Sequence, residues 1–146
     1  MLSKKEIICP ENLLRVGKSK GIAKAVIVNA GKLVAMEATK QATDIGLIEP
    51  IFVGDQTAIE KYASELKWNI SKYDIINEAN ENNTAPIAAK MASEGRVKII
   101  VKGHIHTDIL MKAVLKRDLN LIGKKRLSHV WHMTLNKSDR PFIITD

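Results

Sequence analysis

The strongest constraint on the fold of this chain is a regular alternation of two hydrophobic patterns. Short runs rich in β-branched residues, typical of buried strands, alternate with longer runs whose apolar residues recur at helical spacing. The expected strands cover residues 25–30, 50–54, 71–77 and 97–101. The expected helices cover residues 32–46, 57–66, 83–95 and 107–117. Four strand-then-helix units in a row predict a parallel sheet covered by helices on both faces.

Residues with strong capping and turn preferences mark several of these boundaries. Asp55 is expected to cap the helix that follows it, and Thr107 or Asp108 to cap the last helix of the alternation. Pro86 is expected in the first turn of its helix and Gly95 just after that helix ends.

The last part of the chain departs from the alternation. Residues 126–135 and 140–146 are two strand-like runs, and the turn-forming residues 136–139 between them predict an antiparallel hairpin. A short helix is expected over residues 10–18. The predicted fold class is therefore a three-layer α/β/α arrangement with a doubly wound, mostly parallel sheet and a C-terminal antiparallel hairpin. We expect residues 1–146 to form a single α/β domain.

Composition narrows the class of protein further. The chain has 146 residues, 45% of them hydrophobic, which is enough to bury a core of ordinary size. Cys9 is the only cysteine, so no internal disulfide is expected and nothing indicates an oxidising compartment. No apolar run approaches the roughly 20 residues that span a bilayer, and the N-terminus has no secretory signal pattern. We expect a cytoplasmic protein without a membrane partner.

The net charge of +7 raises the possibility of a polyanionic partner. Aromatic residues make up only 4% of the chain, so the stacking platform for single-stranded nucleic acid is missing and nucleic-acid binding is not favoured. One basic cluster stands out, and its simplest interpretation is a solvated helix face and loop. A phosphate-bearing small ligand, such as a nucleotide or CoA, is the alternative. The cluster comprises Lys112, Lys116, Arg117, Lys124, Lys125 and Arg126.

Gly17, Lys18 and Ser19 are similar to the end of a phosphate-binding P-loop. That motif needs a glycine five residues before Gly17, where this chain has Asn12, and it needs a preceding strand. A nucleotide-hydrolysing loop is therefore not expected here.

The four histidines fall into two pairs and raise the question of a zinc site. His104 and His106 alternate in an extended segment, so their rings are expected on the same side. His129 and His132 are three residues apart in a predicted strand, so only one of them could join the first pair. Histidines that form local hydrogen bonds or line a cleft are the preferred interpretation, and we expect no metal.

The segment from Lys102 to Asp108 fits a phosphate site better than a metal site. In a parallel α/β sheet, ligands bind beyond the carboxyl ends of the strands, where glycine lets the backbone approach and the next helix offers unpaired N–H groups. Lys102 and Gly103 occupy such a junction, and Thr107 could cap the helix or donate to a phosphate oxygen. A capped helix start without a ligand remains the alternative.

Three separated motifs carry a resemblance to a known family. The runs GLIEPIFVGD, KGHIHTDILMKAVL and RLSHVWHMTLNKSDRPFIITD, in this order, resemble the first half of phosphate acetyltransferases and phosphate butyryltransferases. The likeness is greatest to the branch fused to enoyl-CoA hydratase-type domains, and it covers about residues 25–146. The resemblance implies an isocitrate/isopropylmalate dehydrogenase-like first domain and a transferase that moves an acyl group between acyl phosphate and CoA.

The same resemblance implies which residues contact substrate. Lys102, Gly103, His106 and Thr107 fall on the cleft-facing loop of the family and are expected to contact phosphate or acyl phosphate. Ser128, from the Ser-His pair, is a weaker candidate of the same kind. CoA enters as a substrate and no cofactor is expected. The helix after this loop carries a phosphate-binding arginine in the acetyltransferase branch, whereas this chain has methionine and lysine at residues 111–112.

The family's Ser, Arg and Asp groups that carry much of the chemistry lie in its C-terminal half. The chain stops at Asp146 directly after an apolar strand, so we expect an incomplete or truncated phosphate acyltransferase whose second domain is absent. No catalytic residue can be assigned within it. The alternative is a non-catalytic binding or assembly module. In both cases we expect a homo-oligomer or pairing with a separate C-terminal half, since a missing half leaves apolar surface exposed.

Overall fold

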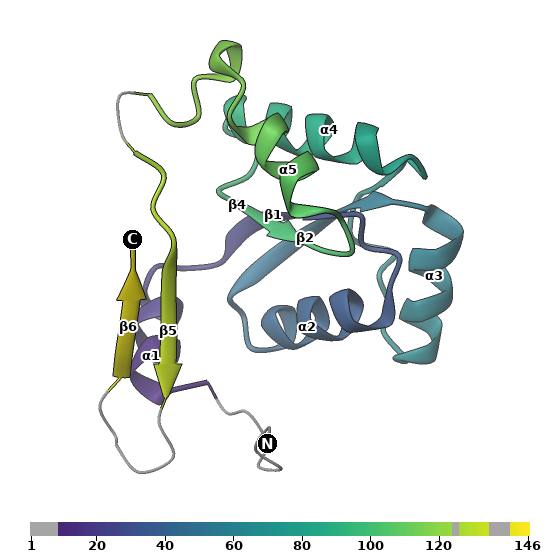
Figure 1. Ribbon diagram of the computed structural model, residues 1–146. Helices are drawn as coiled ribbons and strands as arrows, with labels where there is room; N and C mark the ends of the chain where they lie inside the picture. Colours follow the sequence, from purple (N-terminus) through teal and green to yellow (C-terminus); the bar gives the residue numbers. More distant parts are fainter. Residues whose placement is uncertain (1–8, 124–125, 135–140) are drawn as a thin grey trace, which may run out of the picture.

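Strands and helices alternate along the chain in the computed structural model as the hydrophobic pattern predicts (Figure 1). The structure describes residues 9–123, 126–134 and 141–146. The elements are α1 (Glu11–Ser19), β1 (Ala23–Val28), α2 (Leu33–Asp44), β2 (Ile48–Gly54), α3 (Gln56–Glu65), β3 (Ile75–Asn77), α4 (Glu81–Ser93), β4 (Ile99–Lys102), α5 (Thr107–Val114), a 3₁₀ turn (Arg117–Leu119), β5 (Val130–Thr134) and β6 (Pro141–Thr145).

The first four strands form one parallel sheet with the order β3-β2-β1-β4. Strand β1 is central and pairs with β2 on one side and β4 on the other; Val28, for example, lies opposite both Val53 and Lys102. Helices α2 and α3 cover one face of the sheet, and α4 and α5 cover the other (Figure 1). The doubly wound three-layer α/β/α fold is therefore confirmed.

Alternate residues of β1 fill two separate cores. Ala25 and Ile27 pack toward α2 and α3, whereas Val26 and Val28 pack toward α4 and α5, and all four are fully buried. Both faces of a covered parallel strand must be apolar, which is why the run has no polar alternation. Burying one valine or isoleucine side chain contributes about 1.5–3 kcal/mol. These two cores hold the carboxyl ends of the strands in place.

Several predicted boundaries were wrong near the ends of elements. Helix α4 begins at Glu81 rather than residue 83, because the Asn80 side chain accepts a hydrogen bond from the Asn82 N–H at 3.0 Å. Pro86 consequently lies inside the helix and not in its first turn. Strand β3 is shorter than predicted, because a turn with a Tyr73 N–H to Ile70 carbonyl bond of 2.9 Å precedes it.

The prediction that Asp55 caps its helix is confirmed. Its side chain accepts hydrogen bonds from the backbone N–H groups of Thr57 and Ala58, at 2.9 and 3.3 Å. Gly95 follows the end of α4 with φ of +70°, a backbone conformation that favours glycine. The P-loop-like residues 17–19 form the end of α1 rather than a loop after a strand, so they lack the geometry of a P-loop.

The predicted antiparallel hairpin is confirmed as a second, separate sheet of β5 and β6. Strand β5 starts at Val130, four residues later than predicted. Before it, the His129 N–H donates to the Asp146 carboxylate at 2.7 Å, and this bond lowers the pKa of Asp146. The predicted turn over residues 136–139 lies outside the described residues.

Among the residues that the structure describes, no helix is both long enough and apolar enough to cross a bilayer.

Candidate functional site

The candidate site lies where the direction of winding of the sheet changes. From β1 the chain passes to β2 through α2 on one face, and it reaches β4, the other neighbour of β1, through α4 on the opposite face. The carboxyl ends of β1 and β4 therefore lie side by side with diverging connections beyond them. Such a switch point is where open α/β sheets bind ligands.

Two short loops meet at this switch point and are joined by three hydrogen bonds. The Gly103 N–H donates to the Val28 carbonyl at 2.9 Å, and the His104 N–H donates to the Asn29 carbonyl at 3.1 Å. The Asn29 side-chain amide donates back to the His104 carbonyl. Asn29 itself has φ of +54°, a conformation that asparagine tolerates better than most residues. The loop after β4 is thus fixed to the end of β1.

Gly103 is required by this packing. A Cβ at that position would lie 2.4 Å from the Val28 carbonyl oxygen and 2.7 Å from the Asn29 carbonyl oxygen. Both atoms are backbone and cannot move cheaply. The sequence predicts that the backbone at Gly103 comes close to another group. In this structure that group is the backbone at the end of β1.

A cavity of about 340 Å³ lies beyond the end of β4. Its lining includes three of the predicted site residues, Lys102, His106 and Thr107, together with His104 and Glu81. Ile105 is buried in the core below the loop, whereas His104 and His106 are exposed, so the alternation predicted for this His-x-His segment holds.

Ser128 is the predicted residue that the structure does not bring to this cavity. It is exposed, precedes β5, and does not contribute to the described lining. Its motif placed it at the start of a strand, but β5 begins two residues later, at Val130.

Glu81 is the site residue that sequence reasoning missed. Its Oε1 atom lies 2.8 Å from His106 Nδ1 and also accepts the His106 backbone N–H at 2.5 Å. These two hydrogen bonds, the backbone one first, lower the pKa of Glu81, and the nearby rings of His106 and His104 add to the effect. The pair joins residues 25 apart in sequence, so no local pattern signals it.

The start of α5 differs from the prediction, because neither Thr107 nor Asp108 caps it. The N-cap residue is His106, whose side chain does not cap the helix and instead faces Glu81. Within the described chain, the backbone N–H groups of Thr107, Asp108 and Ile109 have no protein acceptor. Unpaired N–H groups and the positive end of a helix dipole attract anions. The Lys102 side chain, without an ion-pair partner among the described residues, adds a positive charge beside them.

No group of three or more potential metal-binding side chains occurs in the described ranges 9–123, 126–134 and 141–146. The expectation that this protein binds no metal stays a prediction.

Known proteins are similar to this sequence over nearly its whole length. The chain is 34% identical to a phosphate acetyltransferase of Rickettsia typhi over 134 residues, which is 92% of this chain and 38% of that protein. It is 30% identical to a phosphate butyryltransferase of Clostridium acetobutylicum over 129 residues, 88% of this chain and 43% of that protein. This chain is similar to phosphate acetyl- and butyryltransferases over most of its own length. No protein-family model matches it.

The similarity covers only part of each of these phosphate acyltransferases. The chain spans about two fifths of the length of the curated relatives it matches, which fits the resemblance to one half of the family's fold.

Solved structures of phosphotransacylases share the fold. A phosphotransacetylase from Streptococcus pyogenes superposes with a TM-score of 0.70 at 16% identity, over 93% of this chain and 51% of that one. A phosphotransacetylase from Staphylococcus aureus gives 0.67 at 20% identity, over 91% and 49% of the two chains. A branched-chain phosphotransacylase from Enterococcus faecalis gives 0.64 at 23% identity, over 86% and 43%.

Proposed function

We propose that this chain provides the phosphate-binding wall of a phosphate acyltransferase. The reaction is acyl-CoA plus phosphate giving CoA plus acyl phosphate, with CoA as a substrate and no further cofactor. One observation carries the proposal: Lys102, His106 and Thr107 line one cavity at the switch point of the sheet, and the Thr107 N–H is the first of the unpaired N–H groups at the start of α5. That arrangement offers positive charge and donors to an anion.

The chemistry explains what such a wall would do. In the direction that consumes acyl phosphate, the CoA thiol loses its proton to a base and its sulfur attacks the carbonyl carbon of the acyl phosphate. The bond from that carbon to the bridging phosphate oxygen then breaks. Negative charge grows on the departing phosphate, so donors already in place there favour the transition state. We assign this supporting role to Lys102 and Thr107, with Gly103 holding the loop in place and His106 at the edge of the site beside Glu81.

Glu81 determines how His106 can take part. Its carboxylate accepts from Nδ1, which leaves Nε2 of the exposed ring to face solvent or ligand. The carboxylate also makes the cavity less attractive for an anion near His106, so we place the phosphate on the Lys102 and Thr107 side of the cavity.

No catalytic acid, base or oxyanion donor is assigned within this chain. We propose that those groups belong to residues equivalent to the remaining three fifths of the relatives' length, and that the reaction takes place in the cytoplasm.

The experiment that tests the proposed function is a calorimetric titration with inorganic phosphate, paired with an assay of CoA-dependent phosphate release from acetyl phosphate and butyryl phosphate. We expect phosphate binding that Lys102→Ala weakens, and little turnover. Robust turnover by this chain alone would contradict the proposal that other residues supply the catalytic groups.

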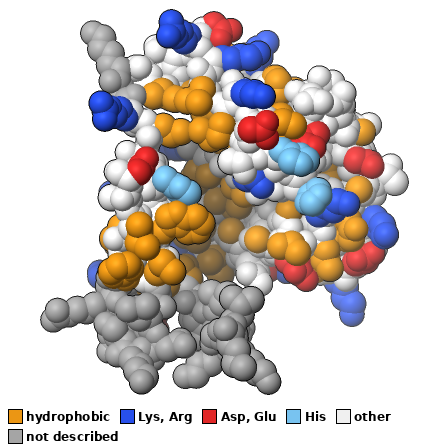
Figure 2. Space-filling model, viewed as in Figure 1, with side chains coloured by type: hydrophobic (Ala, Val, Ile, Leu, Met, Phe, Trp, Pro, Cys, Tyr) orange, Lys and Arg blue, Asp and Glu red, His pale blue; other side chains and the backbone are white. Residues whose placement is uncertain are grey.

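A second candidate function, assembly, is supported by one surface. In the hairpin register, Trp131 lies opposite Ile144 and Met133 opposite Phe142, so the four side chains share one face. All four are between 45% and 57% exposed. Figure 2 shows apolar side chains gathered on the hairpin side of the molecule, next to a hollow between the hairpin and the three-layer α/β/α part of the chain. We call these four residues the hairpin apolar face.

We infer that the hairpin apolar face is covered by a second copy of the chain or by a separate second half of the enzyme. An isolated two-stranded hairpin is marginally stable in water, so its apolar side chains favour association. Sedimentation over a range of concentrations tests self-pairing, with Trp131→Lys as the disrupting variant and Lys61→Gln, on α3, as the control. A wild-type chain that stays monomeric at the highest concentration would leave only the separate half.

A further inference from the structure

A second cavity lies on the other side of the loop that follows β4. It has a volume of about 220 Å³ and lies between α2 and β4. Its lining shares Lys102 and His104 with the polar cavity described above. The remaining lining residues are Lys32, Val34, Ala35, Ala38, Val101 and Gly103.

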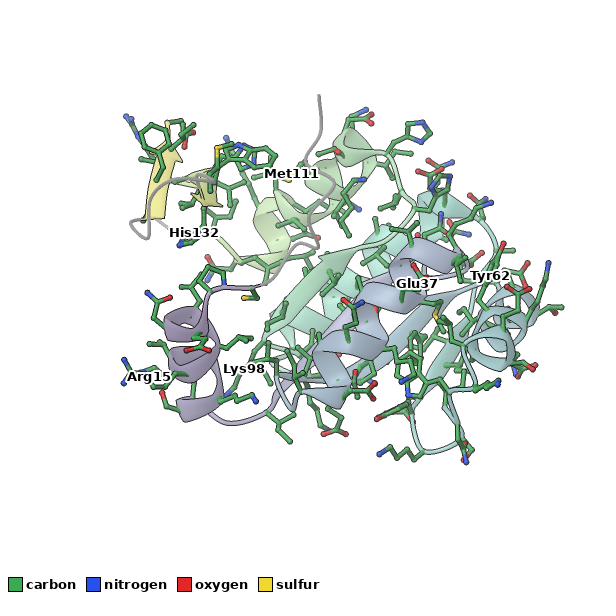
Figure 3. The ribbon with its side chains drawn as sticks, turned by 90° about the horizontal axis from the view of Figure 1, so that it is seen from below. Arg15, Glu37, Tyr62, Lys98, Met111 and His132 are labelled. Carbon is green, nitrogen blue, oxygen red and sulfur yellow. The ribbon has the colours of Figure 1, made fainter. Side chains whose placement is uncertain are left out.

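The two cavities differ in chemistry. The cavity beyond the end of β4 is lined by Glu81 and His106. The cavity beside α2 has no carboxylate in its lining, and its helix wall consists of Val34, Ala35 and Ala38. The helix wall comes from the first turns of α2, on the face of the molecule seen in Figure 3, where Glu37 marks the same helix. Small side chains at positions 35 and 38 leave open the space beside Val101 that larger ones would fill.

Val34 is an unusual residue for this place. It is 76% exposed, the highest value among the large apolar side chains of the described chain, although it lies in the first turn of a helix whose other face is packed. A valine there neither caps the helix nor adds to the core. An exposed valine beside an apolar groove favours the binding of an apolar ligand, because the ligand removes its side chain from water.

An acyl phosphate has the same division as these two cavities. It carries a dianionic head and an apolar chain, separated by one carbonyl carbon. A head held near Lys102 and Thr107 leaves the chain to pass the loop at Lys102 and His104, the two residues that both cavities share.

We propose that the groove lined by Val34, Ala35, Ala38 and Val101 binds the acyl chain of the substrate. The proposal rests on the proposed function of the neighbouring cavity and adds the element that selects chain length. Ala38 limits how long a chain the groove accepts, and Val34 covers the chain from the solvent side. Each further methylene buried in the groove should tighten binding about three- to fourfold until the groove is full.

Alkylphosphonates of increasing length test the groove, because they keep the charged head and cannot hydrolyse. We expect affinity to rise from methylphosphonate to butylphosphonate in the wild-type chain, measured by calorimetry. Ala38→Leu, at an exposed position that can accept leucine, should remove the rise and leave methylphosphonate affinity unchanged. Val34→Thr, close in shape but polar, should reduce the rise without changing the head-group affinity.

Gln41→Leu is the matched control, since it adds the same side chain to an exposed position of α2 outside the groove. It should leave every affinity unchanged. Phosphonates that bind with no dependence on chain length would overturn the groove and leave the phosphate site standing. An Ala38→Leu chain that loses methyl and butyl compounds equally would overturn it as well. If neither phosphate nor any phosphonate binds, the proposed function itself is contradicted, and the groove with it.

Discussion

Glu81 Oε1 lies 2.8 Å from His106 Nδ1, and the same oxygen accepts the His106 backbone N–H. One carboxylate from the first turn of α4 therefore fixes both the backbone and the ring of the N-cap residue of α5. In a capping box, a glutamate of the same helix bonds the N-cap N–H. Here the glutamate comes from a neighbouring helix and ties the two helices together at the edge of the cavity.

The Glu81 contact predicts a pH-dependent stability. Hydrogen bonds from His106 lower the pKa of Glu81 below its ordinary value of 4.5. A carboxylate whose pKa is lower in the folded state stabilises the fold above its unfolded pKa, and this stabilisation is lost as pH falls through the folded value. The difference in free energy of unfolding between wild type and Glu81→Gln should thus be greatest near neutral pH and shrink in acid.

Urea denaturation at several pH values between about 7 and 3 measures this difference. Glu37→Gln is the control, because Glu37 is an exposed carboxylate on α2 with no hydrogen bond or ion pair among the described residues. A Glu81→Gln difference that stays constant across the range would contradict the contact.

Gly103→Ala should destabilise the chain by about 3 kcal/mol, the upper part of the range for overpacking. The added methyl group would meet two backbone oxygens at 2.4 and 2.7 Å. Gly17→Ala is the matched control. There the new Cβ lies 3.0 Å from the end of the Leu47 side chain, which can move, and alanine is the better helix former in α1 by up to about 1 kcal/mol. Equal stability of the two variants, measured by urea denaturation, would rule out the close approach at Gly103.

Asn29 should respond differently to alanine and to glycine. Both substitutions remove the side-chain bond to the His104 carbonyl, but only alanine must also adopt φ of +54° at a cost of about 1–2 kcal/mol. We therefore expect Asn29→Ala to be less stable than Asn29→Gly by about 1 kcal/mol. If alanine proves the more stable of the two, the left-handed backbone at Asn29 is wrong.

Much of the fold follows from sequence because its two inner strands, β1 and β2, are buried on both faces. The apolar run at residues 25–30 has no polar alternation, and a run of this kind between two helical patterns predicts a central parallel strand. Asp55 could likewise be assigned as a cap, because its hydrogen bonds reach only to Thr57 and Ala58.

The features that the sequence did not reveal depend on contacts between distant residues. Glu81 reads as an ordinary acidic residue near the start of a helix, and its importance appears only when α4 and α5 pack side by side. Asn29 likewise reaches a residue 75 positions away. Lys102, His106 and Thr107 are predicted together because they lie close together in sequence, between the end of β4 and the start of α5, whereas Ser128, from a different segment, does not join them.

The central claim is that inorganic phosphate binds at the start of α5 beside Lys102. The most direct test is a titration with phosphate at constant ionic strength, followed by the backbone amide NMR signals of the wild-type chain and of Lys102→Ala. We predict saturable shifts concentrated at the amides of residues 103–109, and weaker binding in the variant. Shifts spread over the lysine-rich surface, or none at the start of α5, would contradict the account.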